Sequence, residues 1–251
     1  MNIKKPKIAL IGYGAMGKEI ERISREKDLI ITDIFEIDSK ISEQKRYEFD
    51  VAIDFGYPEF VIQNVKVLSK LKKNIVIGTT AWYNGLKEVK DIVEENNIAC
   101  IYGSNFSIGV QMFQRITELS AKLINRVSGY DIMLHELHHQ RKKDSPSGTA
   151  LSLAEIILNN VEEKKEIIAD KCDDRISHKQ LHVTSTRGGE IIGTHTVYMD
   201  SYADAIELTH RAKNRTGFAE GAISAAMWIH GKKGFYHFND MLNDLWKDIY
   251  G

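Results

Sequence analysis

The sequence has few cysteines and no long apolar run. Its two cysteines, Cys100 and Cys172, lie far apart and outside any CxxC spacing. This excludes a disulfide framework and a thiolate zinc site, and it suits a reducing cytosol. No stretch approaches the roughly 20 apolar residues that span a bilayer. We therefore expect a cytoplasmic protein that does not enter a membrane.

The sequence also lacks an excess of either charge, internal repeats and low-complexity tracts. Lys and Arg number 34 against 35 Asp and Glu, so the formal net charge is -1. This balance gives no overall field that attracts nucleic acid or an anionic membrane, and we predict neither as a partner. The 251 residues, 43% hydrophobic and 27% charged, suffice for one large domain or two modest ones.

Short β-rich segments alternate with helical segments over the first hundred residues. The predicted strands are 7–12, 29–36, 51–56, 74–80 and 98–104, and the predicted helices are 15–26, 58–71 and 86–97. This alternation predicts βαβ units with right-handed crossovers, and hence a Rossmann-type α/β fold with a doubly wound parallel sheet.

The alternation ends after residue 107, which predicts a second, strand-rich domain. Helices are expected at 110–125, 148–161 and 217–231, strands at 130–139, 180–187, 193–201 and 204–212, and an exposed charged connection at 162–180. The last three strands, separated by short turns, are predicted to be antiparallel.

A GxGxxG pattern follows the first predicted strand and opens the first predicted helix. Gly12 permits a tight turn, Gly14 lets the backbone approach a pyrophosphate, and Gly17 lets helix and strand pack closely. The helix start then offers N–H groups to phosphates. The pattern predicts a dinucleotide site formed by Gly12, Tyr13, Gly14, Ala15, Met16 and Gly17.

The same motif predicts an acidic residue at the end of the second strand, where it bonds the adenosine ribose. Asp33, Glu36 and Asp38 are the candidates, and Glu36 lies where this strand should end. The next residue, Ile37, is not an arginine that would receive a 2′-phosphate. This favours NADH over NADPH without excluding either.

Small polar segments end two further strands of the predicted sheet. They are GTT, with Gly78, Thr79 and Thr80, and GSNF, with Gly103, Ser104, Asn105 and Phe106. Ligands of doubly wound sheets bind beyond the carboxyl ends of the strands. We therefore predict that these residues surround the nicotinamide half of the cofactor.

The run HELHHQRKKDSPSGTA at 135–150 gathers histidines and basic residues. Zinc could use His135, His138 and His139, but the preceding residues alternate like a strand and no HExxH motif occurs. One short basic patch without interleaved aromatic residues is also a poor nucleic-acid site. We expect no metal, and a plain solvated loop remains an alternative.

The end of this run favours an anion pocket. Cationic side chains precede Ser-Pro-Ser-Gly-Thr, which opens a predicted helix. Ser147, Gly148 and Thr149 would then donate to a carboxylate at the helix start. Histidine beside lysine adds a proton source that titrates near neutrality.

These residues resemble the signature of the 4-hydroxy-tetrahydrodipicolinate reductase (dihydrodipicolinate reductase) family, roughly E-x-H-H-x-x-K-x-D-x-P-S-G-T-A. IGYGAMG, GTT, NFSIG, GTHTV and THRAKNRTGFAEGA also follow the family pattern in order, so the resemblance spans essentially the whole chain. It implies a Rossmann domain formed by 1–107 and 214–251. An inserted α+β mixed-sheet domain at 108–213 would bind substrate and form a homotetramer.

The resemblance also implies a reaction and residue roles. The reaction is reduction by NADH or NADPH of 4-hydroxy-tetrahydrodipicolinate, via dihydrodipicolinate, to tetrahydrodipicolinate on the diaminopimelate route to lysine. His138 would exchange the proton, His139 would contact substrate, Lys142 would be the catalytic lysine, and Gly148 with Thr149 would hold a substrate carboxylate. The family members that favour NADPH can carry an arginine where this chain has Ile37.

Two other functions are compatible with a dinucleotide fold. One is another nicotinamide oxidoreductase of amino-acid metabolism, such as an aspartate- or homoserine-type dehydrogenase, which would lack the ELHHQRKKDSPSGTA run. The other is a non-catalytic NAD(H)-binding sensor, which turnover of NADH would distinguish from an enzyme.

Overall fold

The structure, a computed structural model, describes residues 5–169, 172 and 174–249. The chain divides into two compact units. Unit 1 combines the segment that ends at Ser107 with the segment that begins at Arg215, and unit 2 is Ile108–Asn214. Among the described residues, none of the helices is long and apolar enough to cross a bilayer.

Unit 1 is built on a six-stranded sheet in the order β11-β5-β4-β3-β1-β2, with every pair parallel. Its strands are β1 (Ile8–Ile11), β2 (Ile31–Phe35), β3 (Val51–Asp54), β4 (Asn74–Ile77), β5 (Ala99–Tyr102) and β11 (Gly234–His237). All residues of β1 and β3 are buried, as expected for a parallel sheet that is covered on both faces. The predicted Rossmann-type sheet is confirmed.

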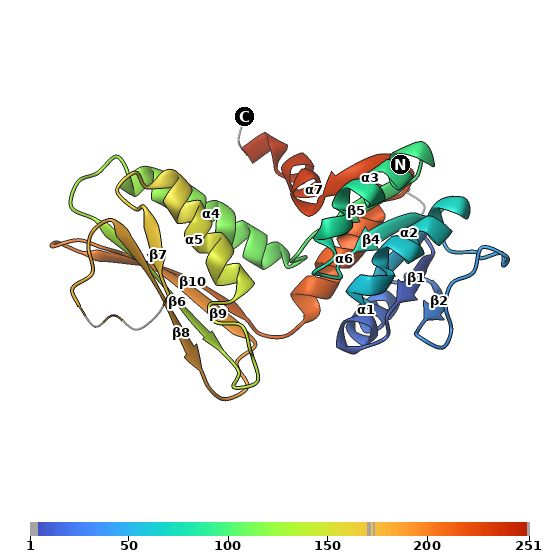
Figure 1. The fold of residues 1–251 in the computed structure, drawn as a ribbon, viewed down its shortest axis with the longest axis horizontal. Coiled ribbons are helices and arrows are strands. Elements are labelled where there is room, and N and C mark those ends of the chain that lie inside the picture. Colours follow the sequence, from blue (N-terminus) through green and yellow to red (C-terminus); the bar gives the residue numbers. More distant parts are fainter. Residues whose placement is uncertain (1–4, 170–171, 173, 250–251) are drawn as a thin grey trace. The chain divides into compact units, whose positions relative to one another are not determined.

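The helices of unit 1 pack in pairs, α1 with α6 and α2 with α3 (Figure 1). They are α1 (Ala15–Glu26), α2 (Val61–Lys70), α3 (Leu86–Glu95), α6 (Thr216–Ile229) and α7 (Phe238–Leu245), with short 3-10 turns at Pro58–Phe60, Tyr83–Gly85 and Lys247–Ile249. Helix α6 lies against β3, β4 and β5. A Cβ on Gly221 of this helix would lie 1.7 Å from the Phe106 carbonyl oxygen, so the small residue allows a close approach.

Unit 2 is a five-stranded mixed sheet in the order β10-β9-β6-β8-β7. Its elements are α4 (Ile108–Ile124), β6 (Asp131–His138), α5 (Gly148–Asn160), β7 (Glu166–Ile168), β8 (Gln180–Arg187), β9 (Gly193–Asp200) and β10 (Ala205–Ala212). Figure 1 shows α4 and α5 side by side over the sheet. Residues from both helices, such as Phe113 and Leu153, join the core formed by the inward side chains of β6, β8 and β9.

The predicted pairing of the later strands is wrong for 180–187. Strand β8 is parallel to β6, and β6 lies between β8 and β9, so the Gly-Gly segment that joins β8 to β9 does not form a hairpin. The reason is that α5 carries the chain across the sheet from β6 to the edge strand β7, which is parallel to β8, so that β7 and β8 both run in the direction of β6. Among the described strands of this sheet, the antiparallel pairs are β6 with β9 and β9 with β10.

Two strands and one helix were not predicted. Strand β7 lies within the connection expected at 162–180. Because it is only three residues long, it is too short to show the alternation of a strand. Strand β11 and helix α7 extend unit 1 after α6. Residues 170, 171 and 173 of the predicted connection lie outside the described residues.

Candidate active site

The three glycines of the GxGxxG motif occupy three different environments. Gly12 has φ +87°, and a Cβ there would lie 2.7 Å from the Phe55 carbonyl oxygen. A Cβ on Gly17 would lie 2.4 Å from the Gly12 carbonyl oxygen, so helix α1 needs glycine to pack on the turn. Gly14 has nothing within 4 Å of its Cβ position, and no side chain caps α1. This open helix start fits the pyrophosphate of a dinucleotide.

A pocket lies beside this turn, where the carboxyl ends of β1, β2 and β3 meet. The order of the sheet reverses at β1, with β2 on one side and β3 on the other, which is where doubly wound folds bind ligands. The lining side chains include Tyr13, Glu36, Ile37, Asp38 and Lys40. Asp33 is not among them. Of the three acidic candidates, Glu36 and Asp38 therefore line the pocket and Asp33 does not.

The GTT and GSNF segments lie at the same edge of the sheet, but their side chains face different ways. Gly78 is buried under Phe55, and the Thr79 hydroxyl points inward, whereas Thr80 and Ser104 are exposed. Phe106 is 2% exposed and packs against Phe238, with ring centroids 4.5 Å apart. The Asn105 side chain accepts a hydrogen bond from the Ser107 N–H. Gly103 is buried.

Asp54, which the sequence reasoning missed, links the GTT segment to the loop after β3 and to helix α2. Its side chain is fully buried at the end of β3 and accepts hydrogen bonds from the Gly56 N–H at 2.8 Å, the Asn64 amide at 2.9 Å and the Thr79 hydroxyl at 2.9 Å. Burial raises the pKa of Asp54, although these hydrogen bonds oppose the shift. Since Gly56 and Asn64 line the pocket, Asp54 fixes its wall from behind.

In unit 2, the face of the sheet that meets the helices changes from apolar to polar along three neighbouring strands. The inward residues of β6 run Ile132, Leu134, Glu136, His138, and those of β8 run Leu181, Val183, Ser185, Arg187. In β9 the corresponding residues run Met199, Val197, His195, Gly193. Register places His195 and Ser185 on either side of Glu136. The polar residues therefore meet at one end of the sheet.

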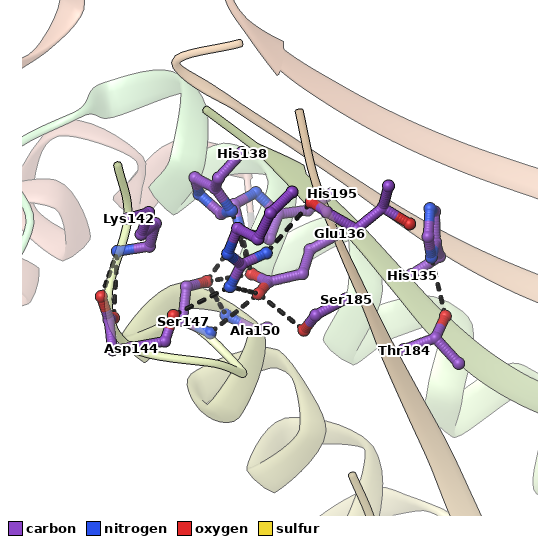
Figure 2. A network of polar contacts seen from close by, with 12 residues as sticks. His135, Glu136, His138, Lys142, Asp144, Ser147, Ala150, Thr184, Ser185 and His195 are labelled. Carbon is purple, nitrogen blue, oxygen red and sulfur yellow. Dashed lines mark hydrogen bonds and ion pairs between the residues drawn. The ribbon is translucent and has the colours of Figure 1, made fainter. Parts of the chain in front are cut away.

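Glu136 is the centre of this polar group. Its carboxylate is fully buried and accepts from the Ser147 N–H at 3.0 Å, the Ser185 hydroxyl at 2.8 Å and the Arg187 guanidinium at 2.7 Å. The Ser147 hydroxyl also donates to it, and His195 Nε2 lies 3.4 Å away (Figure 2). Burial raises the pKa of Glu136, but hydrogen bonds from His195, Ser147, Arg187 and Ser185 outweigh it and hold the pKa well below its usual range.

His138 lies next to this carboxylate. It is 6% exposed, and its Nδ1 lies 3.4 Å from Glu136 Oε2. Burial lowers the pKa of His138 to about 4; the Glu136 charge opposes the shift, whereas His195, Lys142 and Arg187 reinforce it. The imidazole is therefore neutral at neutral pH in the free site.

The start of helix α5 is open. Ser147 is the N-cap, and its hydroxyl accepts from the Ala150 N–H at 3.2 Å. Gly148 is exposed, with nothing within 4 Å of its Cβ position. Nearby, Lys142 binds both oxygens of Asp144 at 2.8 and 2.9 Å (Figure 2), and this ion pair lowers the pKa of Asp144. An anion can approach the helix start at Gly148, where first-turn N–H groups attract negative charge.

The three histidines of the run at 135–150 do not converge on one point. His135 lies on the opposite face of β6 from His138 and contacts the Thr184 hydroxyl at 2.7 Å. His139 is partly buried just past the strand, and its backbone N–H donates to Ile191 at 2.7 Å. A zinc site made of His135, His138 and His139 is therefore excluded by geometry.

A different trio is close enough to share an ion. The donor atoms of Glu136, His138 and His195 lie within 4.8 Å of one another. However, both Glu136 oxygens already accept hydrogen bonds, one of them from the Arg187 guanidinium. A metal ion would place a second cation against this carboxylate, so the arrangement is better described as a hydrogen-bonded charge cluster.

The sequence reasoning missed Glu136, Ser185, Arg187 and His195. Each comes from a strand that alternates normally until its inward residue becomes polar. A row of inward polar residues is expensive to bury unless the residues hydrogen-bond to one another. The change from apolar to polar inward residues in three predicted strands was therefore the sequence signal that could have revealed this cluster.

Together, a doubly wound sheet with an open glycine turn and a second sheet with a buried acid–histidine cluster define a two-unit Rossmann-fold oxidoreductase. Family models agree: the N-terminus of dihydrodipicolinate reductase matches residues 6–106, and its C-terminus matches residues 109–242. The chain belongs to the dihydrodipicolinate reductase family, whose members use a nicotinamide cofactor.

Individual relatives support the assignment. The 4-hydroxy-tetrahydrodipicolinate reductase of Christiangramia forsetii is 38% identical over 243 residues, which cover 96% of this chain and 99% of that protein. The enzyme of Archaeoglobus fulgidus is 41% identical over 204 residues, covering 78% and 77%. The solved structure of dipicolinate-bound dihydrodipicolinate reductase from Paenisporosarcina sp. TG-14 has a TM-score of 0.74 at 22% identity, covers 94% of this chain and 99% of that one, and shows the same fold.

Proposed function

We propose that this protein reduces 4-hydroxy-tetrahydrodipicolinate, via dihydrodipicolinate, to tetrahydrodipicolinate in the diaminopimelate route to lysine. The observation that carries the proposal is the polar end of unit 2, where the open start of α5 lies beside a buried histidine. A dicarboxylate needs an electropositive place to bind, and reduction of a conjugated ring needs a proton as well as a hydride. This end of unit 2 offers both.

We assign roles to the residues of this region accordingly. Gly148 and Thr149 bind one substrate carboxylate at the helix start. The Lys142 ammonium group leaves its ion pair with Asp144 and binds the substrate instead. His138 exchanges a proton with substrate, and His139 contacts it. Burial and the nearby cations keep His138 neutral in the free site. A bound dianion offsets the cations, and so raises the tendency of this imidazole to take up a proton.

Unit 1 binds the cofactor in this proposal. The Gly12–Gly17 turn holds the pyrophosphate, and Glu36 accepts hydrogen bonds from the adenosine ribose. The GTT and GSNF segments, which follow β4 and β5, surround the nicotinamide, and Thr80 and Ser104 are their exposed side chains. When bound, the nicotinamide supplies the hydride. Glu36 followed by Ile37 favours NADH. Lys40, which lines the same pocket, is a cation within reach of a 2′-phosphate and supports some use of NADPH.

Unit 2, besides binding substrate, carries the subunit contacts of a homotetramer in this proposal. Helices α4 and α5 cover one face of its sheet, and Met133 on the other face is 36% exposed. Apolar side chains are also exposed along α4, namely Met112, Ile116, Leu119 and Leu123. Contiguous exposed apolar surface of this kind commonly marks an interface.

Oxidation of NADH and of NADPH by the purified protein tests the function, with enzymatically generated 4-hydroxy-tetrahydrodipicolinate as substrate. We expect turnover with both cofactors and a lower KM for NADH. Turnover of aspartate semialdehyde or another amino-acid precursor instead would assign the chain to a different reductase. Binding of NADH without turnover of any of these compounds would identify a sensor.

A further inference from the structure

The polar cluster of unit 2 contains an acid to which the proposed reaction has given no role. Glu136 is fully buried, and hydrogen bonds to the Ser147 N–H, the Ser185 hydroxyl and the Arg187 guanidinium fix its orientation. These donors come from the start of α5 and from β8, whereas Glu136 lies on β6. A carboxylate held from two other elements cannot turn away from its neighbours.

The neighbour that matters is His138. Its Nδ1 is buried and has no hydrogen-bond partner among the described residues, yet Glu136 Oε2 lies only 3.4 Å away. The opposite ring nitrogen, Nε2, borders Gly193: a Cβ on that glycine would lie 3.1 Å from it. Any side chain at Gly193 would therefore crowd Nε2, and glycine keeps this nitrogen unobstructed by a side chain.

Resting on the proposed function, we propose that Glu136 is the positioning residue for His138. Its fixed carboxylate directs Nδ1–H inward and leaves Nε2 as the atom that exchanges a proton with substrate. A carboxylate behind the imidazole selects the tautomer and stabilises the imidazolium once the ring is protonated.

The surrounding charges show why this carboxylate is needed. The groups that face His138 are Glu136 on its own strand, His195 from β9, Arg187 from β8 and Lys142 from the loop after β6. Burial and the three basic groups lower the pKa of His138, and Glu136 alone opposes them. Without the Glu136 charge, the ring would hold a proton only at still lower pH.

The variants Glu136→Gln and Glu136→Asp distinguish the effect of the carboxylate charge from the effect of the side-chain length. We expect Glu136→Gln, which keeps the shape and loses the charge, to lower kcat by up to the roughly 10²–10⁴-fold that general acid–base catalysis contributes. The alkaline limb of its kcat–pH profile should move about 1–3 pH units toward acid, because loss of an opposite charge a few ångströms away lowers the pKa of a histidine by about that much. Glu136→Asp should lower kcat through its shorter reach and keep the limb near the wild-type pH.

A double-mutant cycle with His138→Asn and a control in the other unit complete the test. If Glu136 acts through His138, Glu136→Gln should lower kcat little further in the His138→Asn background. Asp54→Asn removes an equally buried carboxylate from unit 1 and should leave the alkaline limb in place. The far-UV circular dichroism spectrum and the thermal unfolding midpoint report whether each variant is folded. If Glu136→Gln does not fold, Glu136→Asp tests the proposal, which predicts a lower kcat and an alkaline limb at the wild-type pH.

The outcomes distinguish this inference from the proposed function. If the wild-type protein does not reduce the substrate, the proposed function is wrong. If the wild type is active and folded Glu136→Gln keeps its kcat and pH profile, or if the losses of Glu136→Gln and His138→Asn simply multiply, the positioning role is wrong and the function stands.

Discussion

Each unit of the molecule buries one acidic side chain completely among the described residues, and the two differ in their partners. Asp54 in unit 1 accepts hydrogen bonds from a backbone N–H, an amide and a hydroxyl, all of them neutral. Glu136 in unit 2 accepts from hydroxyls and a backbone N–H as well, but also from the Arg187 guanidinium. Their pKa values shift in opposite directions: that of Asp54 upward, that of Glu136 downward.

This difference shows how one side-chain chemistry serves two purposes. Burial disfavours the charge of any carboxylate, and neutral donors offset that cost only in part. Asp54 therefore acts as a structural connection between the loop after β3, helix α2 and the GTT segment. Glu136, with a cation beside it, remains a fixed anion and can polarise a neighbouring histidine. Unit 1 is accordingly expected to control cofactor binding and unit 2 to control proton transfer.

The largest effect that tests this division between the two units is expected from the loss of His138. We expect His138→Gln to lower kcat by roughly 10²–10⁴-fold, because it removes the group that exchanges a proton, while NADH binding stays unchanged. His135→Gln is the matched control, since His135 lies on the same strand and faces the other side. Equal losses in the two variants would show that His138 has no special role.

The matching test in unit 1 is Glu36→Ala. Charge-assisted hydrogen bonds contribute about 1.5–3 kcal/mol, so the affinity for NADH should fall roughly 10- to 100-fold with kcat nearly unchanged. Asp33→Ala, which removes an acid outside the pocket, serves as the control. If Asp33→Ala weakens NADH binding and Glu36→Ala does not, the ribose contact belongs to Asp33.

Acid stability sharpens the comparison further. His138 has a pKa lowered from 6.5 to about 4 in the folded protein, so the unfolded chain binds more protons between these values. Stability from this group is complete above pH 6.5 and falls as the pH drops toward 4, by up to about 1.4 kcal/mol per pH unit. Urea unfolding of wild type and His138→Gln should therefore converge between pH 7 and pH 5. Parallel pH dependence would contradict a buried, neutral His138.

A smaller effect is expected for Thr149→Val, which removes a hydroxyl at the start of α5. One neutral hydrogen bond contributes about 0.5–1.5 kcal/mol, so KM for the dicarboxylate should rise roughly 2- to 10-fold, more than kcat falls. KM for NADH is the internal control. A change confined to NADH would remove Thr149 from the substrate site.

No effect is expected from chelation. Because Arg187 already neutralises Glu136, the cluster with His138 and His195 needs no ion, and EDTA should leave activity unchanged. Steady-state rates before and after dialysis against EDTA measure this. Activity that is lost on dialysis and restored by zinc would mean that the cluster is a metal centre.

Much of unit 1 could be predicted from the sequence because its signals are local. The GxGxxG turn lies within six residues, and Glu36 follows directly from the end of the next strand. Helix and strand periods are likewise visible within a single segment. The role of Asp54 was not predicted, since its partners Asn64 and Thr79 come from helix α2 and from the turn after β4.

In unit 2, the sequence by itself determined the helix start at Gly148 and placed His138 and Lys142 next to it, because capping and charge patterns act over a few residues. Only the tertiary structure decided that β6 lies between β8 and β9, and so that Glu136 meets Ser185, Arg187 and His195. Residues about 50 to 60 positions apart meet there because strand order depends on how α5 crosses the sheet and which faces are buried together. No sequence pattern within a single segment determines this strand order.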